Sequence, residues 1–314
     1  MPRAAQRNEV RVSRCEQTAL SRRRLLRLSL GLLLLPLPVA GRAAELRVVT
    51  LFQGATDSAV ALGVTPCAVV DSWSERPTYR YLRPALSGVA HVGLETQPSL
   101  EDIALLQPDV IVASRFRHAR IAPLLARMGQ LVMLDEVFEF KQTLQTMGVA
   151  LQREAQAQRL LAHWQRRIGQ LRRRLQSVFG PQWPLTVSVL DIREDHIRSY
   201  LPDSFAGLVL SELGFVWNST ARAASGTSLK LASRESLPVV DAALFVVFQR
   251  RTSAVAEQQY QRLLAHPLWQ QLQAPRQGRV WTVDGVPWSL SGGILGASLM
   301  LDDIEQQLRV LEGM

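Results

Sequence analysis

Cysteine is scarce in this sequence, because Cys15 and Cys67 are the only two among 314 residues. Cys15 lies in an N-terminal segment with the features of an export signal, so the mature chain would keep one cysteine. A single cysteine excludes an intramolecular disulfide, and a hydrophobic core must hold the fold. Cys67 begins the apolar string Cys-Ala-Val-Val, which favours a buried side chain over a reactive thiol.

Metal-ligand clusters and nucleophile motifs are also missing. None of the five histidines has a second His or Cys at ligand spacing, and no Gly-x-Ser-x-Gly string is present. The glycines of the stretch 291–296 lack the Lys-Ser/Thr of a phosphate loop, and they indicate a tight start to a final helix. The sequence therefore predicts no enzyme, no intrinsic cofactor and no protein-built metal site.

No apolar run is long enough to cross a membrane. The run 28–39 has about 12 residues, against roughly 20 needed, and Pro36 and Pro38 interrupt it. Three arginines at 22–24 precede it and small residues follow it, as in a twin-arginine export signal. We expect residues 1–44 to be a signal peptide cleaved after Ala43 or Ala44, giving a periplasmic protein. An uncleaved membrane anchor is the alternative.

Charge of one sign is not in excess once this leader is set aside. The formal net charge is +9, but nine arginines and only two acids lie in residues 1–43, which leaves 27 basic and 25 acidic groups and a net charge of +2. Nucleic-acid binding needs a concentrated basic face, so no such partner is expected. The run Arg172–Arg174 is expected at a solvated helix end.

The remaining chain alternates apolar strands with helices, which predicts parallel sheets covered on both faces. A first α/β lobe is expected over 45–138 and a second over 179–314. Between them the apolar stripe of residues 139–178 predicts one connecting helix of roughly 55 Å. Strands are expected at Leu46–Leu51, Cys67–Val70, Val110–Ala113, Leu131–Leu134, Leu185–Leu190, Leu244–Val247 and Val280–Val283.

One string carries a family signature. In 91–114 the segment Pro98-Ser-Leu-Glu101 opens a short helix, and Pro108-Asp109 stops it before the strand Val110–Ala113. This string resembles the periplasmic proteins that carry iron(III)-siderophores, haem and cobalamin to ABC importers, and among them the ferric-citrate and ferric-hydroxamate proteins. A later string, His266-Pro-Leu-Trp269, resembles the same family. The resemblance implies a class III periplasmic-binding-protein fold, in which one helix joins two lobes around a ligand cleft.

A siderophore arrives with its iron already saturated, so its receptor needs cations and aromatic walls rather than metal ligands. Candidates follow strand ends: Trp73 and Arg76, Arg115 and Arg117, Arg193 and His196, and Trp288. By the resemblance, Arg117 and Arg193 match arginines of the ferric-citrate protein, and Trp288 matches a tryptophan of both proteins. The alternatives are surface charge for each arginine and ordinary packing under the last helix for Trp288.

Glu95 departs from the resemblance, since both relatives carry a siderophore-contacting arginine there. A carboxylate at this position would repel an anionic ferric complex. Either the ligand is neutral or cationic, as a hydroxamate complex can be, or Glu95 pairs with Arg115 or Arg117.

Two further glutamates match the acidic residues by which this family docks on its permease. They are Glu101 and Glu235, one in each lobe. Exposed acids on the two lobes would orient the protein on the transporter. The alternative is an ordinary first-turn glutamate stabilised by the helix dipole.

These observations predict a monomeric periplasmic protein that captures an iron(III)-siderophore, with hydroxamates favoured, and delivers it to an inner-membrane ABC importer. Ferric citrate, haem and cobalamin remain alternative ligands. A periplasmic enzyme containing a cofactor is the alternative of another class.

Overall fold

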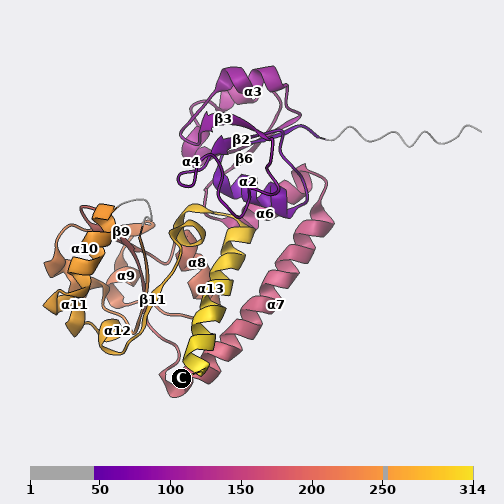
Figure 1. The fold of residues 1–314 in the computed structure, drawn as a ribbon. Helices are drawn as coiled ribbons and strands as arrows, with labels where there is room; N and C mark the ends of the chain where they lie inside the picture. The colour runs from indigo at the N-terminus through magenta and orange to yellow at the C-terminus, as the bar shows by residue number, and fades with distance from the viewer. Residues whose placement is uncertain (1–45, 250–253, 314) are drawn as a thin grey trace, which may run out of the picture. The chain divides into compact units, whose positions relative to one another are not determined.

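The structure is a computed structural model that describes residues 46–249 and 254–313. The expected signal peptide at 1–44, its cleavage point and Cys15 lie outside the described residues. Two β-sheets, each with its own helices, make up the described chain (Figure 1). Within these residues no helix has the length and apolarity that a membrane span requires.

The N-terminal sheet has six strands in the order β4-β3-β2-β1-β5-β6, all parallel except β4. Its central strands β1 and β5 are buried along their length, as the continuous apolar runs predicted. The strands are β1 (Val48–Thr50), β2 (Ala68–Asp71), β3 (Ala90–Leu94), β4 (Gln97–Pro98), β5 (Val110–Ser114) and β6 (Gln130–Leu134). The helices are α2 (Gln53–Ala61), α3 (Leu100–Leu106), α4 (Arg115–His118) and α5 (Ala122–Leu125).

The C-terminal sheet has five strands in the order β11-β10-β7-β8-β9, and β8 and β9 are antiparallel to their neighbours. The strands are β7 (Val187–Ile192), β8 (Ile197–Tyr200), β9 (Ser228–Leu231), β10 (Leu244–Gln249) and β11 (Val280–Thr282). The helical segments are η1 (Gly180–Gln182), α8 (Phe205–Leu213), α9 (Ser219–Ala223), η2 (Arg234–Val240), α10 (Ala254–Leu264), α11 (Pro267–Gln271), α12 (Gln273–Arg276), η3 (Val286–Leu290) and α13 (Ile294–Glu312).

The prediction of one unbroken connecting helix was wrong. The segment forms α6 (Phe140–Ala150) and α7 (Glu154–Phe179), with Gln152 at a left-handed φ of 55° between them. Gly148 makes the corner possible, because a Cβ there would lie 2.8 Å from the Cβ of Ala157. The 26 residues of α7 extend roughly 39 Å, short of the expected length.

A second helix accompanies α7, because α13 packs beside it (Figure 1). Arg167 of α7 pairs with Asp302 at 2.7 Å and with Glu305 at 2.8 Å. Arg174 pairs with Glu312 at 2.5 Å, near the far ends of both helices. The two helices α7 and α13 are therefore joined by ion pairs, a pairing that the sequence did not predict although it predicted both helices.

Candidate functional site

The turn after β5 brings the first cationic candidates into place. Ser114 ends the strand, and its Oγ accepts a hydrogen bond from the backbone N–H of Arg117 at 3.3 Å, which starts α4. Arg117 therefore follows the carboxyl end of β5, where the sequence predicted it. This is the edge of a parallel sheet at which ligand sites of α/β proteins gather.

Glu95, directly after β3, is buried with 4% of its side chain exposed. Its Oε1 accepts from Nε of Arg117 at 3.3 Å, and its Oε2 accepts from the Trp73 indole and from the backbone N–H of Gln53, both at 3.2 Å. Burial raises the pKa of Glu95, and the nearby Arg117 charge opposes that rise. Of the two pairings expected for Glu95, the structure forms the one with Arg117.

His118 forms a hydrogen bond with the backbone of Glu95. Its Nδ1 accepts from the backbone N–H of Ser114 at 3.1 Å, so Nε2 carries the proton and donates to the Glu95 carbonyl oxygen at 2.8 Å. Burial lowers the pKa of His118, which favours this neutral form. His118 therefore supports the site without contacting solvent.

The guanidinium of Arg117 lies against two aromatic rings. Its central carbon is 5.5 Å from the ring centroid of Trp73 and 4.7 Å from that of Phe116. Trp73 is 42% exposed and Phe116 is 59% exposed, unusual values for large apolar side chains. Phe116 was not among the residues predicted from the sequence, although an aromatic residue between two arginines at a strand end was a signal for it.

Arg115 does not join this cluster. Its Nε pairs with Asp135 at 2.9 Å, and both side chains are about two-thirds exposed. Arg115 is therefore an exposed surface charge in this structure, which was the alternative interpretation of this arginine. Arg76 is also exposed.

In the C-terminal sheet, Arg193 follows β7 and its Nε donates to Oδ2 of Asp191 at 2.7 Å. Asp191 is 1% exposed and Arg193 is 20% exposed. Asp191 was not among the residues predicted from the sequence, although an acid inside the apolar strand Val187–Ile192 needs a partner when it is buried.

Trp288 belongs to the core. It lies in η3 with no exposed surface, and its indole N–H donates to Oδ2 of Asp303 at 2.8 Å. Its surroundings are therefore those of a core residue, as the alternative interpretation of ordinary packing under the last helix described. No ligand could reach this ring without rearrangement of η3 and α13.

The two docking candidates are exposed, each on its own lobe. Glu101 lies in the first turn of α3, where Ser99 caps the helix by accepting from the N–H of Asp102 at 3.3 Å. Glu235 lies in the first turn of η2, and a hydrogen bond from Ser233 lowers its pKa. Neither glutamate forms an ion pair among the described residues.

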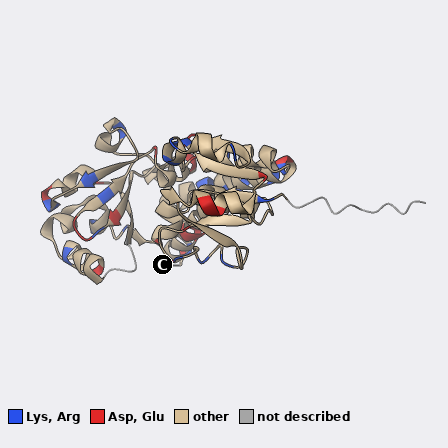
Figure 2. Cartoon of the chain, turned by 90° about the horizontal axis from the view of Figure 1, so that it is seen from above, with Lys and Arg blue, Asp and Glu red and all other residues tan. Residues whose placement is uncertain are grey.

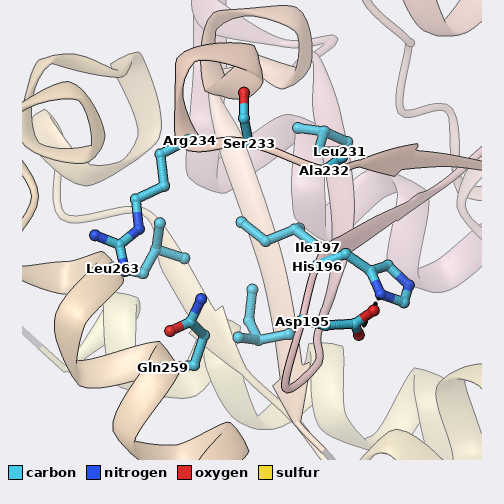
Figure 3. A pocket seen from close by; sticks show the side chains of 10 residues that line it. Asp195, His196, Ile197, Leu231, Ala232, Ser233, Arg234, Gln259 and Leu263 are labelled. Carbon is cyan, nitrogen blue, oxygen red and sulfur yellow. Dashed lines mark hydrogen bonds and ion pairs between the residues drawn. The ribbon is translucent and has the colours of Figure 1, made fainter.

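A small cavity lies in the C-terminal lobe, between the β7–β8 turn, the end of β9 and α10 (Figure 3). Asp195 and His196 are on one side of it, where His196 Nδ1 is 2.6 Å from the Asp195 carboxylate, and Arg234 and Gln259 are on the other. Its volume of about 130 Å³ is below the roughly 300–1,000 Å³ of sites for drug-sized ligands. This cavity is too small for a ferric chelate.

Charges of both signs are interspersed over the described chain, with no single basic face in the view of Figure 2. Among residues 46–249 and 254–313, no group of three His, Cys, Asp or Glu side chains is arranged to hold a metal ion. The chemistry that the described residues offer is recognition by cations and aromatic rings.

The chain is similar in sequence to a family model and to several known proteins. The family model described as "Periplasmic binding protein" matches residues 48–287. The achromobactin-binding periplasmic protein of Dickeya dadantii is 63% identical over 297 residues, covering 93% of this chain and 97% of that protein. The Fe(3+) dicitrate-binding periplasmic protein FecB of Escherichia coli is 29% identical, covering 82% of this chain and 83% of that protein.

A solved structure with the same fold is Staphylococcus aureus SirA complexed with staphyloferrin B. It superposes with a TM-score of 0.79 at 33% identity, over 84% of this chain and 92% of that one. The two-lobed α/β fold expected from the resemblance is confirmed.

Proposed function

This chain belongs to the periplasmic binding protein family, and from that premise we propose that it captures a ferric siderophore, with achromobactin as the first candidate, and delivers it to an ABC importer. The observation that carries the proposal is the similarity to the achromobactin-binding protein along nearly the whole of both chains. The arginine and aromatic side chains at the strand ends supply suitable chemistry.

The structure removes the reason for favouring a hydroxamate. That preference assumed an open carboxylate at Glu95, but the side chain is 4% exposed and faces Arg117. The ligands named for the three proteins compared above are achromobactin, staphyloferrin B and ferric dicitrate. Ferric citrate is therefore the second candidate ligand. The family consists of substrate-binding proteins, so an enzyme is not favoured.

The proposed ligand site comprises Trp73, Glu95 and Arg117 from the N-terminal lobe and Arg193 from the C-terminal lobe. Arg115 is left out of this proposed site, because its charge is paired with Asp135 at the surface. Trp288 contributes only through packing. Glu101 and Glu235 remain proposed contacts with the permease.

We propose that the protein acts in the periplasm, which its family membership supports, and that residues 1–44 are the cleaved twin-arginine signal that takes it there. Replacing Arg22 and Arg23 by lysine should then leave the precursor in the cytoplasm. Fractionation with antibody detection measures this, and continued export of the variant would contradict the twin-arginine route. We further propose lobes at 45–138 and 179–314 and a monomeric protein.

Titration of the purified protein with ferric chelates tests the main proposal. Ferric achromobactin should change the tryptophan fluorescence saturably at micromolar concentration or below, whereas a neutral ferric trihydroxamate should bind far more weakly. Saturation with no ferric chelate, including ferric citrate, would contradict siderophore binding. Conversion of a chelate into a new product would favour an enzyme.

A further inference from the structure

The same arrangement of a carboxylate and an arginine occurs in both lobes. Glu95, after β3, accepts from Nε of Arg117, and Asp191, in β7, accepts from Nε of Arg193. In each pair the acid is buried and the arginine reaches the surface: 4% against 31% exposed in the first pair, and 1% against 20% in the second.

The Nε contacts with the carboxylates do not use the outer edge of either arginine. A guanidinium has an inner edge that includes Nε and an outer edge formed by its two terminal nitrogens, and the outer edge can hold a carboxylate by two parallel hydrogen bonds. Within the described residues, Arg117 makes its side-chain hydrogen bond through Nε. Arg193 also donates to the Tyr200 hydroxyl, and because its one Nε–H already donates to Asp191, this second bond uses one of the four N–H groups on its terminal nitrogens.

Burial argues that the acids do not contact the ligand themselves. Both oxygens of Glu95 already accept from Arg117, Trp73 and Gln53. An arginine side chain that is already held in one conformation before the ligand binds also loses less conformational entropy on binding.

We propose that Glu95 and Asp191 are positioning residues that hold Arg117 and Arg193 by their inner edges, so that each arginine presents its outer edge to an anionic oxygen group of the ferric chelate. The inference rests on the proposed siderophore binding and deepens it. The ligand class is a ferric chelate with at least two anionic oxygen groups, one for each lobe. Glu95, which the sequence marked as an obstacle to anionic ligands, then helps to bind them.

The two acids should respond differently to replacement by their amides. Oδ1 of Asp191 has no hydrogen-bond partner in the described part of the chain, so the NH2 group of Asn can occupy its place while the remaining oxygen still accepts from Arg193. Both oxygens of Glu95 accept from donors, so the NH2 group of Gln must face an N–H in either orientation. The orientation that keeps the Trp73 and Gln53 contacts releases Arg117.

Titration of the purified full-length mature protein with ferric achromobactin tests the proposal. Asp191→Ala and Glu95→Ala should each weaken binding about tenfold, as should Glu95→Gln, whereas Asp191→Asn should bind within about twofold of the parent. Arg115→Ala is the matched control, because Arg115 lies in the same helix as Arg117 and pairs with exposed Asp135, and its affinity should match the parent.

Double variants separate positioning from a general structural role. If each acid acts through its arginine, Asp191→Ala should add no further loss in the Arg193→Ala background, and Glu95→Ala none in the Arg117→Ala background. Additive losses, or equal effects of the two amide variants, would overturn the proposal. If a single alanine variant does not fold, the affinities of the amide variants and of the double variants, in which both charges of a pair are removed, test the proposal instead.

The failure of this inference differs from the failure of the proposed function. A parent protein that binds no ferric chelate contradicts siderophore binding itself. A parent that binds ferric achromobactin while all acid variants bind equally well contradicts only the positioning role. Equal affinity for a neutral ferric trihydroxamate would overturn the anionic ligand class.

Discussion

Asp57 of α2 accepts hydrogen bonds from the backbone N–H groups of Leu295 and Gly296, each at 2.9 Å, although these residues lie more than 200 positions along the chain. The carboxylate therefore caps the start of α13, where the helix dipole favours a negative charge. A Cβ on Gly293 would lie 2.2 Å from Cγ of Asp57, so only glycine permits this approach. The sequence-based interpretation of this glycine stretch as a tight helix start is confirmed.

Asp57 gives the first prediction, on the pH dependence of stability. Burial raises its pKa from 3.8 to about 6, against the opposing hydrogen bonds of Leu295, Gly296 and Tyr81. Between pH 4 and 6 the folded chain holds this proton more tightly than the unfolded chain. The contribution of Asp57 to the free energy of unfolding should therefore fall by about 3 kcal/mol as pH rises through that window, and stay constant above it.

Urea unfolding at pH 4, 5, 6 and 7 measures this contribution as the difference between the parent and Asp57→Asn. A parent-to-variant difference that stays constant from pH 4 to 7 for Asp57→Asn would contradict the prediction.

Trp73 should report ligand binding. Its indole is 42% exposed, donates to Glu95 and lies beside Arg117, whereas Trp269 is 2% exposed in the core of the C-terminal lobe. Trp73→Phe should remove most of the fluorescence change caused by ferric achromobactin, and Trp269→Phe should leave it intact. An unchanged signal in Trp73→Phe would show that the chelate binds elsewhere.

Arg193→Ala should lower stability as well as affinity. Asp191 is 1% exposed and relies on Arg193 for its compensating charge, so removing the arginine leaves a buried carboxylate unpaired. We expect a loss of about 2–3 kcal/mol, below the usual cost for a fully buried pair because Arg193 is partly exposed.

Chemical denaturation compares Arg193→Ala with Arg115→Ala, whose exposed pair with Asp135 should contribute about 0–1 kcal/mol. Asp191→Asn in the Arg193→Ala background should recover part of the loss. Equal stability of the two arginine variants would show that Asp191 finds its compensation elsewhere.

Trp288→Phe should affect folding rather than recognition. The indole is fully buried and donates to Asp303, whose pKa burial raises and this hydrogen bond lowers. Phenylalanine leaves that carboxylate without its donor and opens a small cavity, so we expect a loss of about 2–3 kcal/mol with unchanged chelate affinity. A large loss of affinity in a stable variant would return Trp288 to the ligand site.

Glu101→Ala combined with Glu235→Ala should reduce iron uptake in cells and leave chelate affinity unchanged, because both side chains are exposed and lie outside the proposed ligand site. Exposed charges of this kind mainly accelerate association and orient the partners. Asp102→Ala, a change to the exposed neighbour of Glu101, is the control. Normal uptake by the double variant would refute the docking role.

The sequence determined the fold class, because continuous apolar strands alternating with amphipathic helices bury their surfaces well only in parallel sheets covered by helices. It also located Arg117 and Arg193, since the carboxyl ends of such strands share one edge of a sheet. Strand β3 was not predicted, because His91 and Gly93 interrupt the apolar pattern of Ala90–Leu94.

Tertiary structure decided what each of these side chains does. Glu95 and Arg117 are 22 residues apart, and no local pattern says whether a carboxylate will face the ligand or accept from an arginine behind it. Trp288 and Arg115 were likewise both candidates for the ligand site from the sequence. In the folded chain Trp288 is buried by packing, and Arg115 pairs with Asp135 at the surface. Periodicity reports which face of an element is buried, whereas the partner of a charge depends on distances that only the folded chain sets.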